Sequence, residues 1–366
     1  MFTLFTLILS INQVLANYVL IPKNILSVDS IHNLEIELNI EKIVKVPEFP
    51  IYITTKENLE KYNTVLNHHF IIEKDSLYSI KEVDYVLIES NPWHVKEITE
   101  NKEIRDCHQN KDLEIVNYLI DTGIDIYHTE LSGRAEFGKD FSGEENNIDG
   151  VGHGTFCSGL ILGKTYSVCQ NAQRIVAVKV LGKDGSGSMS NVLKGLEWVL
   201  SHHNSNSKQS EKKVKSIVNM SLGGAKSMII DGIVRHILLN KDITIIVAAG
   251  NENQDLSKVS PASSPGVIPV MASTKDNTRA FFSNYGGLFF APGHQITGIV
   301  PGNKTSTMSG TSFSSPLMVS VVNHYIDKYP DLNRKQVLKL LQKKFKKNHI
   351  SESQDVPNFF PLIPEN

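Results

Sequence analysis

The chain has 366 residues, of which 40% are hydrophobic, so it is long enough to form more than one domain with a buried core. The 37 Lys and Arg residues are balanced by 39 Asp and Glu residues, which gives a net charge of -2. This balance excludes the strong basic excess through which proteins bind nucleic acids or anionic membranes by charge. We therefore expect no nucleic-acid partner.

The N-terminus predicts an export signal. Residues 1–16, MFTLFTLILSINQVLA, form an apolar run that ends in small residues. The run is shorter than the ~20 residues that span a bilayer, and a short run of this kind is typical of a secretory signal peptide. Because no Lys or Arg follows Met1, an uncleaved anchor and a buried first strand remain alternatives. No other stretch resembles a transmembrane segment, so we expect a secreted or cell-surface protein.

Residues 17–90 predict a small α+β domain. Stretches rich in β-forming residues at 49–55 (FPIYITT) and 83–90 (VDYVLIES) lie on either side of a helical stretch at 56–69, which is rich in Lys and Glu. The pattern changes near residue 91, which we take as the start of a second domain that extends to residue 366.

In residues 91–366, short apolar runs alternate with helical stretches, such as 190–203 and 230–240. The polar stretch 202–213 predicts a surface loop. Apolar strands that alternate with helices are typical of a parallel sheet covered on both faces, so the sequence predicts a three-layer α/β/α domain with a mostly parallel sheet. The apolar runs are IVNYLID (115–121), RIVAVKVL (174–181), KSIVNMSL (215–222), ITIIVAAG (243–250) and GVIPVMAS (266–273).

Polar residues that directly follow such strands are the first candidates for a site, because ligands gather outside the carboxyl ends of parallel strands. Asp121 ends one run in LIDTGID, and Asn251 follows another in VAAGN. His153 stands among glycines in GVGHGTFCSG, and Ser312 stands in SGTSFSSP, each ahead of an apolar helical stretch.

These residue types together suit acyl transfer. A serine hydroxyl is a weak nucleophile that needs an imidazole base, and the imidazole needs a carboxylate to fix its tautomer and stabilise its cation. An Asn amide and a backbone N–H can stabilise the oxyanion that forms on the attacked carbonyl. Taken singly, the Asp can cap a turn, the His can be structural and the Ser-rich run can be a polar turn. Their joint occurrence favours a catalytic site.

The order of these motifs and the residues in them resemble those of the subtilisin-like serine peptidases, with the proteinase K branch the most similar. Further matches are VKVLGKDGSGS, MSLGG, SPASSPG and FSNYG, and the resemblance covers residues 92–341. It implies a subtilisin-like fold and a serine endopeptidase that requires no cofactor. It also implies that Asp121, His153 and Ser312 form the catalytic triad and that Asn251 stabilises the oxyanion.

The resemblance further implies a substrate channel and a zymogen. Residues 17–90 resemble, weakly, the family's inhibitory propeptide, so we expect this domain to inhibit the peptidase that follows it. We expect self-processing between about Leu87 and Asn91, in a monomeric enzyme that acts on proteins or peptides. The residues expected to pair with an extended substrate backbone are Gly185, Ser186, Gly187, Ser188, Ser221, Leu222 and Gly223.

The chain has 3 cysteines, so at least one thiol is left without a partner inside the chain if disulfides form. Cys157 follows the histidine motif and matches a free thiol of the proteinase K branch, which would lie near His153; its alternative role is that of a small buried hydrophobic residue. The spacing does not decide whether Cys107 and Cys169 pair. The sequence contains no CxxC motif, and we expect no zinc site.

The sequence departs from the family pattern in three places. Phe313 and Ser314 follow the GTS motif where relatives have Met and Ala, and Phe156 replaces a His or similar residue after GHGT. These changes predict altered packing and specificity. The stretch GLFFAPG lacks the aspartate that binds calcium in relatives, so calcium is not expected at that position, although another calcium site stays open.

Two sequons of the N-glycosylation type are relevant if the protein is secreted. Asn303, in NKT, is an expected glycosylation acceptor if the protein is secreted. Asn219, in NMS, falls on a predicted buried strand and is expected to stay unmodified.

Parts of the sequence suggest functions other than that of an endopeptidase. A catalytically silent peptide-binding protein of the same fold is the first alternative, and the presence of all the catalytic residue types counts against it. A nucleotide-binding protein is suggested by LGKT at 162–165, but a phosphate loop would need Gly where Ser158 stands. An esterase of the α/β-hydrolase type would need a G-x-S-x-G motif, which does not surround Ser312.

Overall fold

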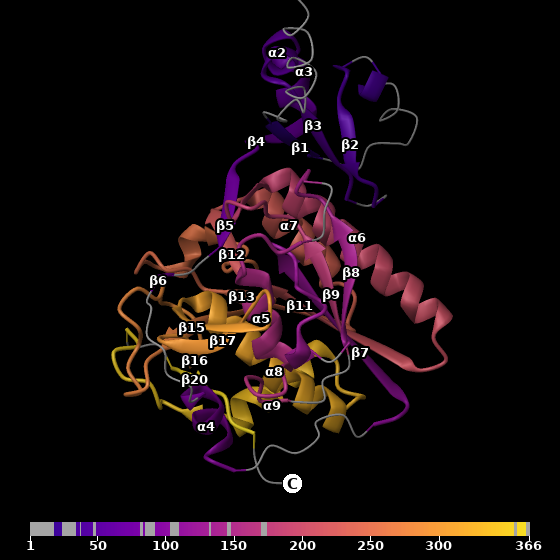
Figure 1. The fold of residues 1–366 in the computed structure, drawn as a ribbon. Helices are drawn as coiled ribbons and strands as arrows, with labels where there is room; N and C mark the ends of the chain where they lie inside the picture. The colour runs from indigo at the N-terminus through magenta and orange to yellow at the C-terminus, as the bar shows by residue number, and fades with distance from the viewer. Residues whose placement is uncertain are drawn as a thin grey trace, which may run out of the picture. The chain divides into compact units, whose positions relative to one another are not determined.

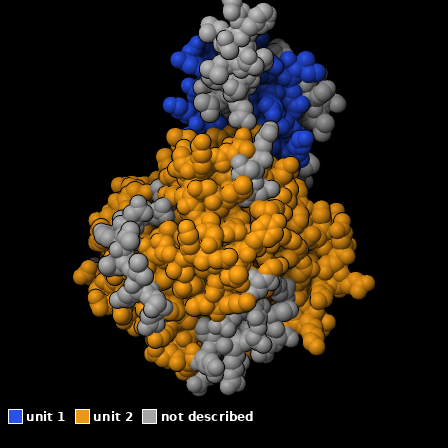
Figure 2. Space-filling view, in the orientation of Figure 1, with its two compact units in different colours: residues 1–76 blue, residues 77–366 orange. Residues whose placement is uncertain are grey.

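The computed structural model divides the chain into two compact units, residues 1–76 and 77–366 (Figure 2). The predicted signal peptide and the predicted processing region from Leu87 to Asn91 lie outside the described residues. The structure describes residues 18–23, 34–36, 38–46, 49–80, 83–84, 92–102, 110–131, 133–144, 148–169, 174–354 and 357–363.

The first unit is a small α+β fold. Its four strands form an antiparallel sheet in the order β2-β3-β1-β4, and Leu20, Tyr52 and Leu66 lie in its buried core. The stretch predicted as one helix is broken at Tyr62, which ends the first helix and precedes the second. The elements are β1 (Tyr18–Pro22), β2 (Glu41–Val44), β3 (Ile51–Thr54), α2 (Lys56–Lys61), α3 (Asn63–His69) and β4 (Phe70–Lys74).

The second unit is built on a nine-stranded sheet in the order β19-β20-β16-β15-β13-β11-β7-β9-β8. All pairs from β20 to β8 are parallel, and only the edge pair β19-β20 is antiparallel. The five apolar runs of the sequence are the neighbouring strands β9, β7, β11, β13 and β15, as predicted. The strands are β7 (Leu113–Asp121), β8 (Ala135–Asp140), β9 (Arg174–Lys179), β11 (Lys213–Met220), β13 (Ile243–Ala248), β15 (Ile268–Ser273), β16 (Phe289–Pro292), β19 (Lys346–Lys347) and β20 (Phe359–Phe360).

Helices cover both faces of this sheet (Figure 1). On β7, Leu119 shares a buried cluster with Phe156 of α5 and Leu317 of α8, whereas the next residue back, Tyr118, contacts Trp198 of α6 from the other face. The predicted three-layer α/β/α architecture is therefore confirmed. The helices are α4 (Trp93–Thr99), α5 (His153–Leu162), α6 (Met189–Gln209), α7 (Met228–Ile237), α8 (Thr311–Lys328) and α9 (Arg334–Lys344).

Short strands and two 3-10 turns complete the unit. Strand β5 lies between β10 and β12, and β6 pairs with β18. No helix in the described part of the chain has the length and apolar character needed to cross a membrane. The remaining elements are β5 (Leu77–Ile80), β6 (Val83–Asp84), η1 (Thr129–Leu131), β10 (Ser186–Ser188), β12 (Leu222–Ala225), η2 (Leu256–Lys258), β14 (Val259–Ser260), β17 (Ile296–Val300) and β18 (Lys304–Ser309).

The predicted surface loop at 202–213 is wrong over most of its length, because α6 continues to Gln209. Ser and Asn are weak helix formers, and their number in this stretch favoured a loop. Tertiary contacts override that preference: His203 is buried and its Nδ1 lies 2.7 Å from the hydroxyl of Ser216 on β11.

Helix α4 contains a histidine that is fully buried. The Nε2 atom of His94 lies 3.0 Å from the carbonyl oxygen of Tyr166, so this nitrogen carries the proton and donates. Burial lowers the pKa of His94 to about 4, from a usual value of 6.5.

We expect the free energy of unfolding to fall as the pH drops from 6.5 to about 4. The substitution His94→Gln should reduce that fall. Between the two pKa values the unfolded chain binds a proton that the folded protein excludes, so acid favours unfolding, by about 3 kcal/mol in total from this group. Urea unfolding at about pH 7 and about pH 4.5 would measure the difference. An equal loss of stability in both proteins would show that His94 is not the group responsible.

Candidate active site

The fold brings the predicted catalytic residues to one edge of the central sheet. Asp121 is the last residue of β7, and Asn251 follows the end of β13. His153 is the first residue of α5, and Ser312 lies in the first turn of α8. The site is thus assembled from two strand ends and two helix starts, which the sequence places far apart.

Asp121 and His153 form a buried pair. The Nδ1 atom of His153 donates to Oδ1 of Asp121 over 2.8 Å, and both side chains are 0% exposed. Burial lowers the pKa of the imidazole, but the hydrogen-bonded carboxylate of Asp121 raises it, and the pKa of His153 stands well above its usual value. The pair is suited to hold a proton on the imidazole while a charge develops nearby.

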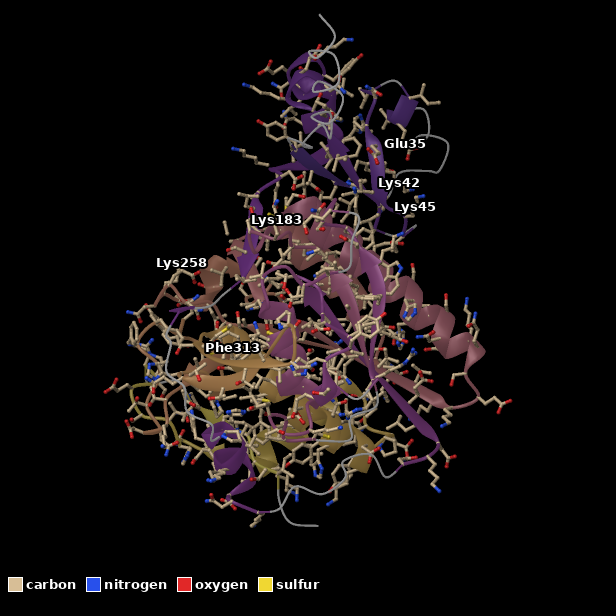
Figure 3. All side chains as sticks on the ribbon, in the orientation of Figure 1. Glu35, Lys42, Lys45, Lys183, Lys258 and Phe313 are labelled. Carbon is tan, nitrogen blue, oxygen red and sulfur yellow. The ribbon has the colours of Figure 1, made fainter. Side chains whose placement is uncertain are left out.

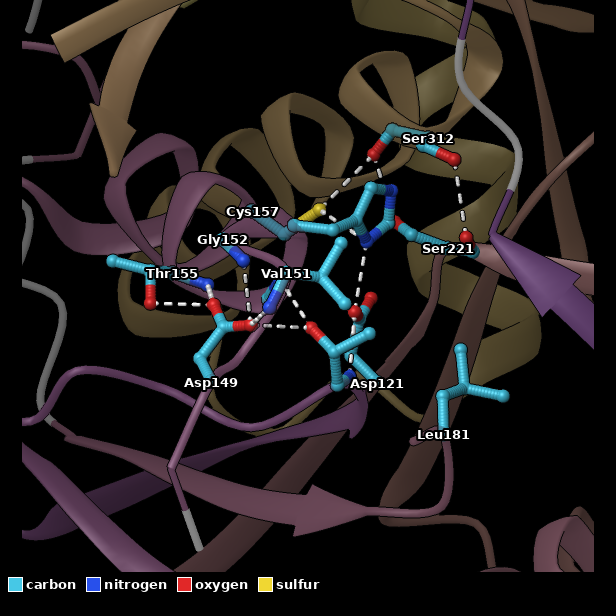
Figure 4. Close-up of polar contacts among 12 residues, drawn as sticks. Asp121, Asp149, Val151, Gly152, Thr155, Cys157, Leu181, Ser221 and Ser312 are labelled. Atoms are coloured by element: carbon cyan, nitrogen blue, oxygen red, sulfur yellow. Dashed lines mark hydrogen bonds and ion pairs between the residues drawn. The ribbon is translucent and has the colours of Figure 1, made fainter. Parts of the chain in front are cut away.

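The nucleophile candidate is not hydrogen-bonded to the Nε2 atom of this imidazole. Its hydroxyl donates to the carbonyl oxygen of Ser221 over 3.0 Å, and the Nε2 atom of His153 is buried without a hydrogen-bond partner (Figure 4). Rotation of Ser312 about its Cα–Cβ bond would bring the hydroxyl away from Ser221, and catalytic hydrogen bonds often form only when substrate binds.

The amide of Asn251 is oriented by the residue before the nucleophile. Its Oδ1 atom accepts from the backbone N–H of Thr311 over 3.0 Å and from the Thr311 hydroxyl over 2.8 Å. Because both donors face the oxygen, the nitrogen end must point the other way, and Nδ2 is buried without a partner. Thr311 was not among the residues predicted for the site, and its hydroxyl next to Ser312 in the sequence was the available signal.

The other hydroxyls of the serine motif have structural partners. Ser314 donates to the carbonyl oxygens of Ala291 and Pro292 over 3.1 and 3.2 Å. Ser315 donates to the side chain of Asn219, and the Ser309 hydroxyl accepts the N–H of Gln295. These bonds explain why so many small hydroxyls are found together: Ser314 and Ser315 join α8 to β16 and β11, and Ser309 joins β18 to the residue before β17.

The two departures from the family pattern contact each other. The rings of Phe156 and Phe313 have centroids 4.6 Å apart, and the ring of Phe313 also lies 5.7 Å from the imidazole of His153. Phe313 is labelled in Figure 3. Both phenylalanines are fully buried, and a Cβ atom on Gly298 would come within 2.8 Å of Phe156. The bulk beside the nucleophile therefore belongs to an aromatic pair that packs under the histidine.

Glycine is required next to the histidine. A Cβ atom at Gly154 would lie 2.0 Å from the carbonyl oxygen of Gly123, so only glycine allows this approach between the two catalytic loops. Gly152 has a φ of 94°, which also favours glycine. The space beside Gly154 is thus filled by the protein's own chain.

Cys157 lies in the site and is a free thiol. Its sulfur is 3.5 Å from the carbonyl oxygen of Ser312 and 4.0 Å from Nδ1 of His153. Burial raises the pKa of the thiol, which favours the neutral form. The described residues leave the pairing of Cys107 untested, since Cys107 lies outside them.

We expect mercurials to slow peptide hydrolysis, because a mercury atom on Cys157 would displace His153 or the start of α8. Cys157→Ser is the matched control and should resist the reagent while keeping most of the activity. Mass spectrometry would establish the labelled residue. Full activity of a protein labelled one-to-one on Cys157 would contradict the expectation.

The predicted channel residues do flank an extended strand, and that strand is part of the same chain. Strand β5 pairs antiparallel with β10 through Ser186–Ser188 and with β12 through Leu222 and Gly223. The N–H of Ile80 also donates to the carbonyl oxygen of Gly185 over 3.1 Å. Main-chain pairing on both sides is the mode in which an added strand binds.

The ligand atoms of Asp121, His153 and Cys157 lie within 4.8 Å of one another. They supply nitrogen, sulfur and carboxylate, unlike the oxygen ligands that calcium takes. Phe289 and Phe290, in the stretch that lacks the family's calcium-binding aspartate, are buried. The absence of a required cofactor stays a prediction.

The two sequons differ in exposure. Asn219 is fully buried on β11, as expected, whereas Asn303 is exposed in the turn before β18. The Oδ1 atom of Asn303 accepts from Thr129, so its side chain is held against η1. Glycosylation at Asn303 remains a prediction.

Comparisons with known proteins agree with this geometry. The sequence profile of the subtilase family matches residues 117–358. The chain is 39% identical over 270 residues to a subtilisin-like serine protease of Rhodotorula mucilaginosa, a match that covers 71% of this chain and 78% of that protein. It is 40% identical over 271 residues to cerevisin of Saccharomyces cerevisiae, covering 71% of this chain but only 42% of cerevisin. A cold-adapted subtilisin-like serine proteinase of known structure superposes with a TM-score of 0.66 at 31% identity, over 75% of this chain and 98% of the other.

Proposed function

Since the chain belongs to the subtilase family of serine proteases, we propose that it is a secreted endopeptidase in which Ser312 attacks the peptide bond and His153 accepts its proton. The observation that carries the proposal is the buried 2.8 Å hydrogen bond between His153 and Asp121, which leaves the imidazole Nε2 atom without a partner. This arrangement fixes the tautomer that a general base requires.

The reaction begins when the Ser312 hydroxyl attacks the substrate carbonyl carbon and passes its proton to Nε2 of His153. The carboxylate of Asp121 stabilises the imidazolium, and the Nδ2 amide of Asn251 donates to the oxyanion. The N-terminal end of α8, where the helix dipole is positive, favours the same negative charge. His153 then protonates the leaving amine, and water hydrolyses the acyl-enzyme by the same proton transfers in reverse.

We propose that the enzyme is made as a zymogen that cleaves itself between Ile80 and Val83. Strand β5 ends at Ile80 and pairs with β12, which follows Ser221. Strand β6 begins at Val83 and pairs with Met308 and Ser309, just before the nucleophile. We therefore infer that the cleaved bond belongs to the short stretch of sequence between the two paired segments. This proposal moves the processing point upstream of the region from Leu87 to Asn91 that the sequence suggested.

N-terminal sequencing of the secreted protein tests this proposal. The wild type should accumulate as a chain that begins between residues 81 and 83, and Ser312→Ala should keep the longer precursor. Ser306→Ala, a serine substitution on β18, is the control and should process normally. Identical N-termini for wild type and Ser312→Ala, in a host without related peptidases, would refute self-cleavage. A start near residues 88 to 91 would restore the sequence-based position.

A further inference from the structure

A second aspartate is buried next to the proposed triad. Asp149 lies in the loop between β8 and α5 and is 4% exposed. Its carboxylate accepts hydrogen bonds from Thr122, Val151, Gly152 and twice from Thr155 (Figure 4). No cation is paired with it among the described residues. All five hydrogen bonds run from donors to the two carboxylate oxygens, so the buried carboxylate has its hydrogen-bond partners inside the protein.

These hydrogen bonds fix the first turn of α5, the helix that begins with His153. Oδ1 accepts the N–H of Gly152 over 2.8 Å, and Oδ2 accepts the N–H and the hydroxyl of Thr155 over 2.7 and 2.6 Å. The residue at the helix cap, Gly152, has no side chain that could bind these groups. Asp149 therefore serves as the missing cap, and its negative charge suits the positive end of the helix.

Thr122 links Asp149, which caps α5, to Asp121, the hydrogen-bond partner of His153. Its hydroxyl donates to Oδ1 of Asp149 over 2.8 Å and accepts the N–H of Gly154 over 3.0 Å. Its backbone N–H donates to Oδ1 of Asp121 over 2.7 Å, the same oxygen that accepts from His153. A continuous set of hydrogen bonds thus holds the carboxylate of Asp121 and the imidazole of His153 in one arrangement.

We propose that Asp149 is a positioning residue for the peptidase reaction, which holds the first turn of α5 and Thr122 so that the imidazole of His153 meets Asp121. The inference rests on the proposed function, because it concerns the placement of the proposed base. Asp149 contacts neither His153 nor Ser312 in the described hydrogen bonds, so its effect passes through the backbone on either side of the histidine.

Asp149→Asn tests the proposal. The amide keeps the shape of the carboxylate but turns an N–H₂ group towards donors on one side, so the loop must shift. We expect kcat to fall ~10²-fold with KM within about twofold of wild type, the scale of a small misplacement in an active site. Asp140→Asn is the matched control, because Asp140 comes just before the same loop and, among the described residues, accepts hydrogen bonds only from Ser142.

A spectroscopic readout separates this proposal from the proposed function. In the Ser312→Ala background, the low-field proton resonance of the His153 Nδ1–H group reports its hydrogen bond to Asp121 without any turnover. We expect Asp149→Asn to shift or broaden this resonance and Asp140→Asn to leave it unchanged. Wild-type kcat together with an unchanged resonance would overturn the proposal. So would a loss of activity confined to KM.

If Asp149→Asn fails to fold, a pair of variants at Thr122 decides. Thr122→Val keeps the shape of the side chain and removes the hydroxyl that joins Asp149 to Gly154, whereas Thr122→Ser keeps the hydroxyl. We expect the valine variant to lose kcat and perturb the His153 resonance, and the serine variant to retain both. Equal behaviour of the two variants would overturn the proposal.

Discussion

Ser312→Ala is expected to lower kcat for peptide hydrolysis by ~10⁶-fold, the scale on which the nucleophile and its base act in subtilisin. The substitution removes the only atom that can form the acyl-enzyme, while the buried pair of Asp121 and His153 stays intact. KM should change little, since the substitution leaves β10 and β12, the strands expected to pair with the substrate main chain, unchanged. Steady-state kinetics on a peptide with a chromogenic leaving group measures both constants.

His153→Ala and Asp121→Ala should each cause a comparable or somewhat smaller loss, and the double variants should lose hardly more than the single ones. The three residues act as one proton-transfer unit, so their effects do not add. Activity should also fall as the pH drops below the raised pKa of His153, because the imidazolium cannot accept a proton. Normal turnover by Ser312→Ala would show that another residue is the nucleophile.

Asn251→Ala is expected to lower kcat by ~10²–10³-fold with little change in KM, because its amide acts mainly on the oxyanion of the transition state. The two hydrogen bonds from Thr311 hold the oxygen end of the amide, so the Nδ2 donor is already oriented before substrate arrives. A donor that is oriented in this way for the transition state affects kcat. A donor that only helped to bind the substrate would affect KM instead.

Variants of Thr311 provide the matched control for Asn251. Thr311→Ser keeps the hydroxyl that donates to Asn251 and should behave nearly as wild type. Thr311→Val removes it and should give part of the loss seen in Asn251→Ala. A loss expressed only in KM, for either Asn251→Ala or Thr311→Val, would contradict the role in stabilising the oxyanion.

The central sheet could be predicted from sequence because its strands are short runs of β-branched and apolar residues buried on both faces. Asp121 and Asn251 could be predicted as site residues because strand ends at one edge of a parallel sheet converge. The end of α6 could not be predicted in this way. Its Ser- and Asn-rich sequence favours a loop, and only the contact of His203 with Ser216 shows why the helix continues.

The finer arrangement of the site depends on contacts that sequence spacing does not encode. The hydrogen bond from Ser312 to Ser221 and the tilted ring contact between Phe313 and Phe156 join segments that are distant in the chain. Asp149 was missed because an aspartate in a glycine-containing loop is more often a turn residue. Its position four residues before His153 was the only available signal, and without the fold that signal cannot be told from chance.

Labelling of the mature protein with a tagged reagent that reacts with activated serines tests the central claim most directly. The reagent requires a nucleophilic hydroxyl, a base and an oxyanion site together, and mass spectrometry identifies the modified residue. We predict a single adduct on Ser312, which disappears in His153→Ala. The absence of any adduct on a folded, processed protein, or an adduct on a different serine, would contradict the assignment of Ser312 and His153 and favour a silent peptide-binding protein.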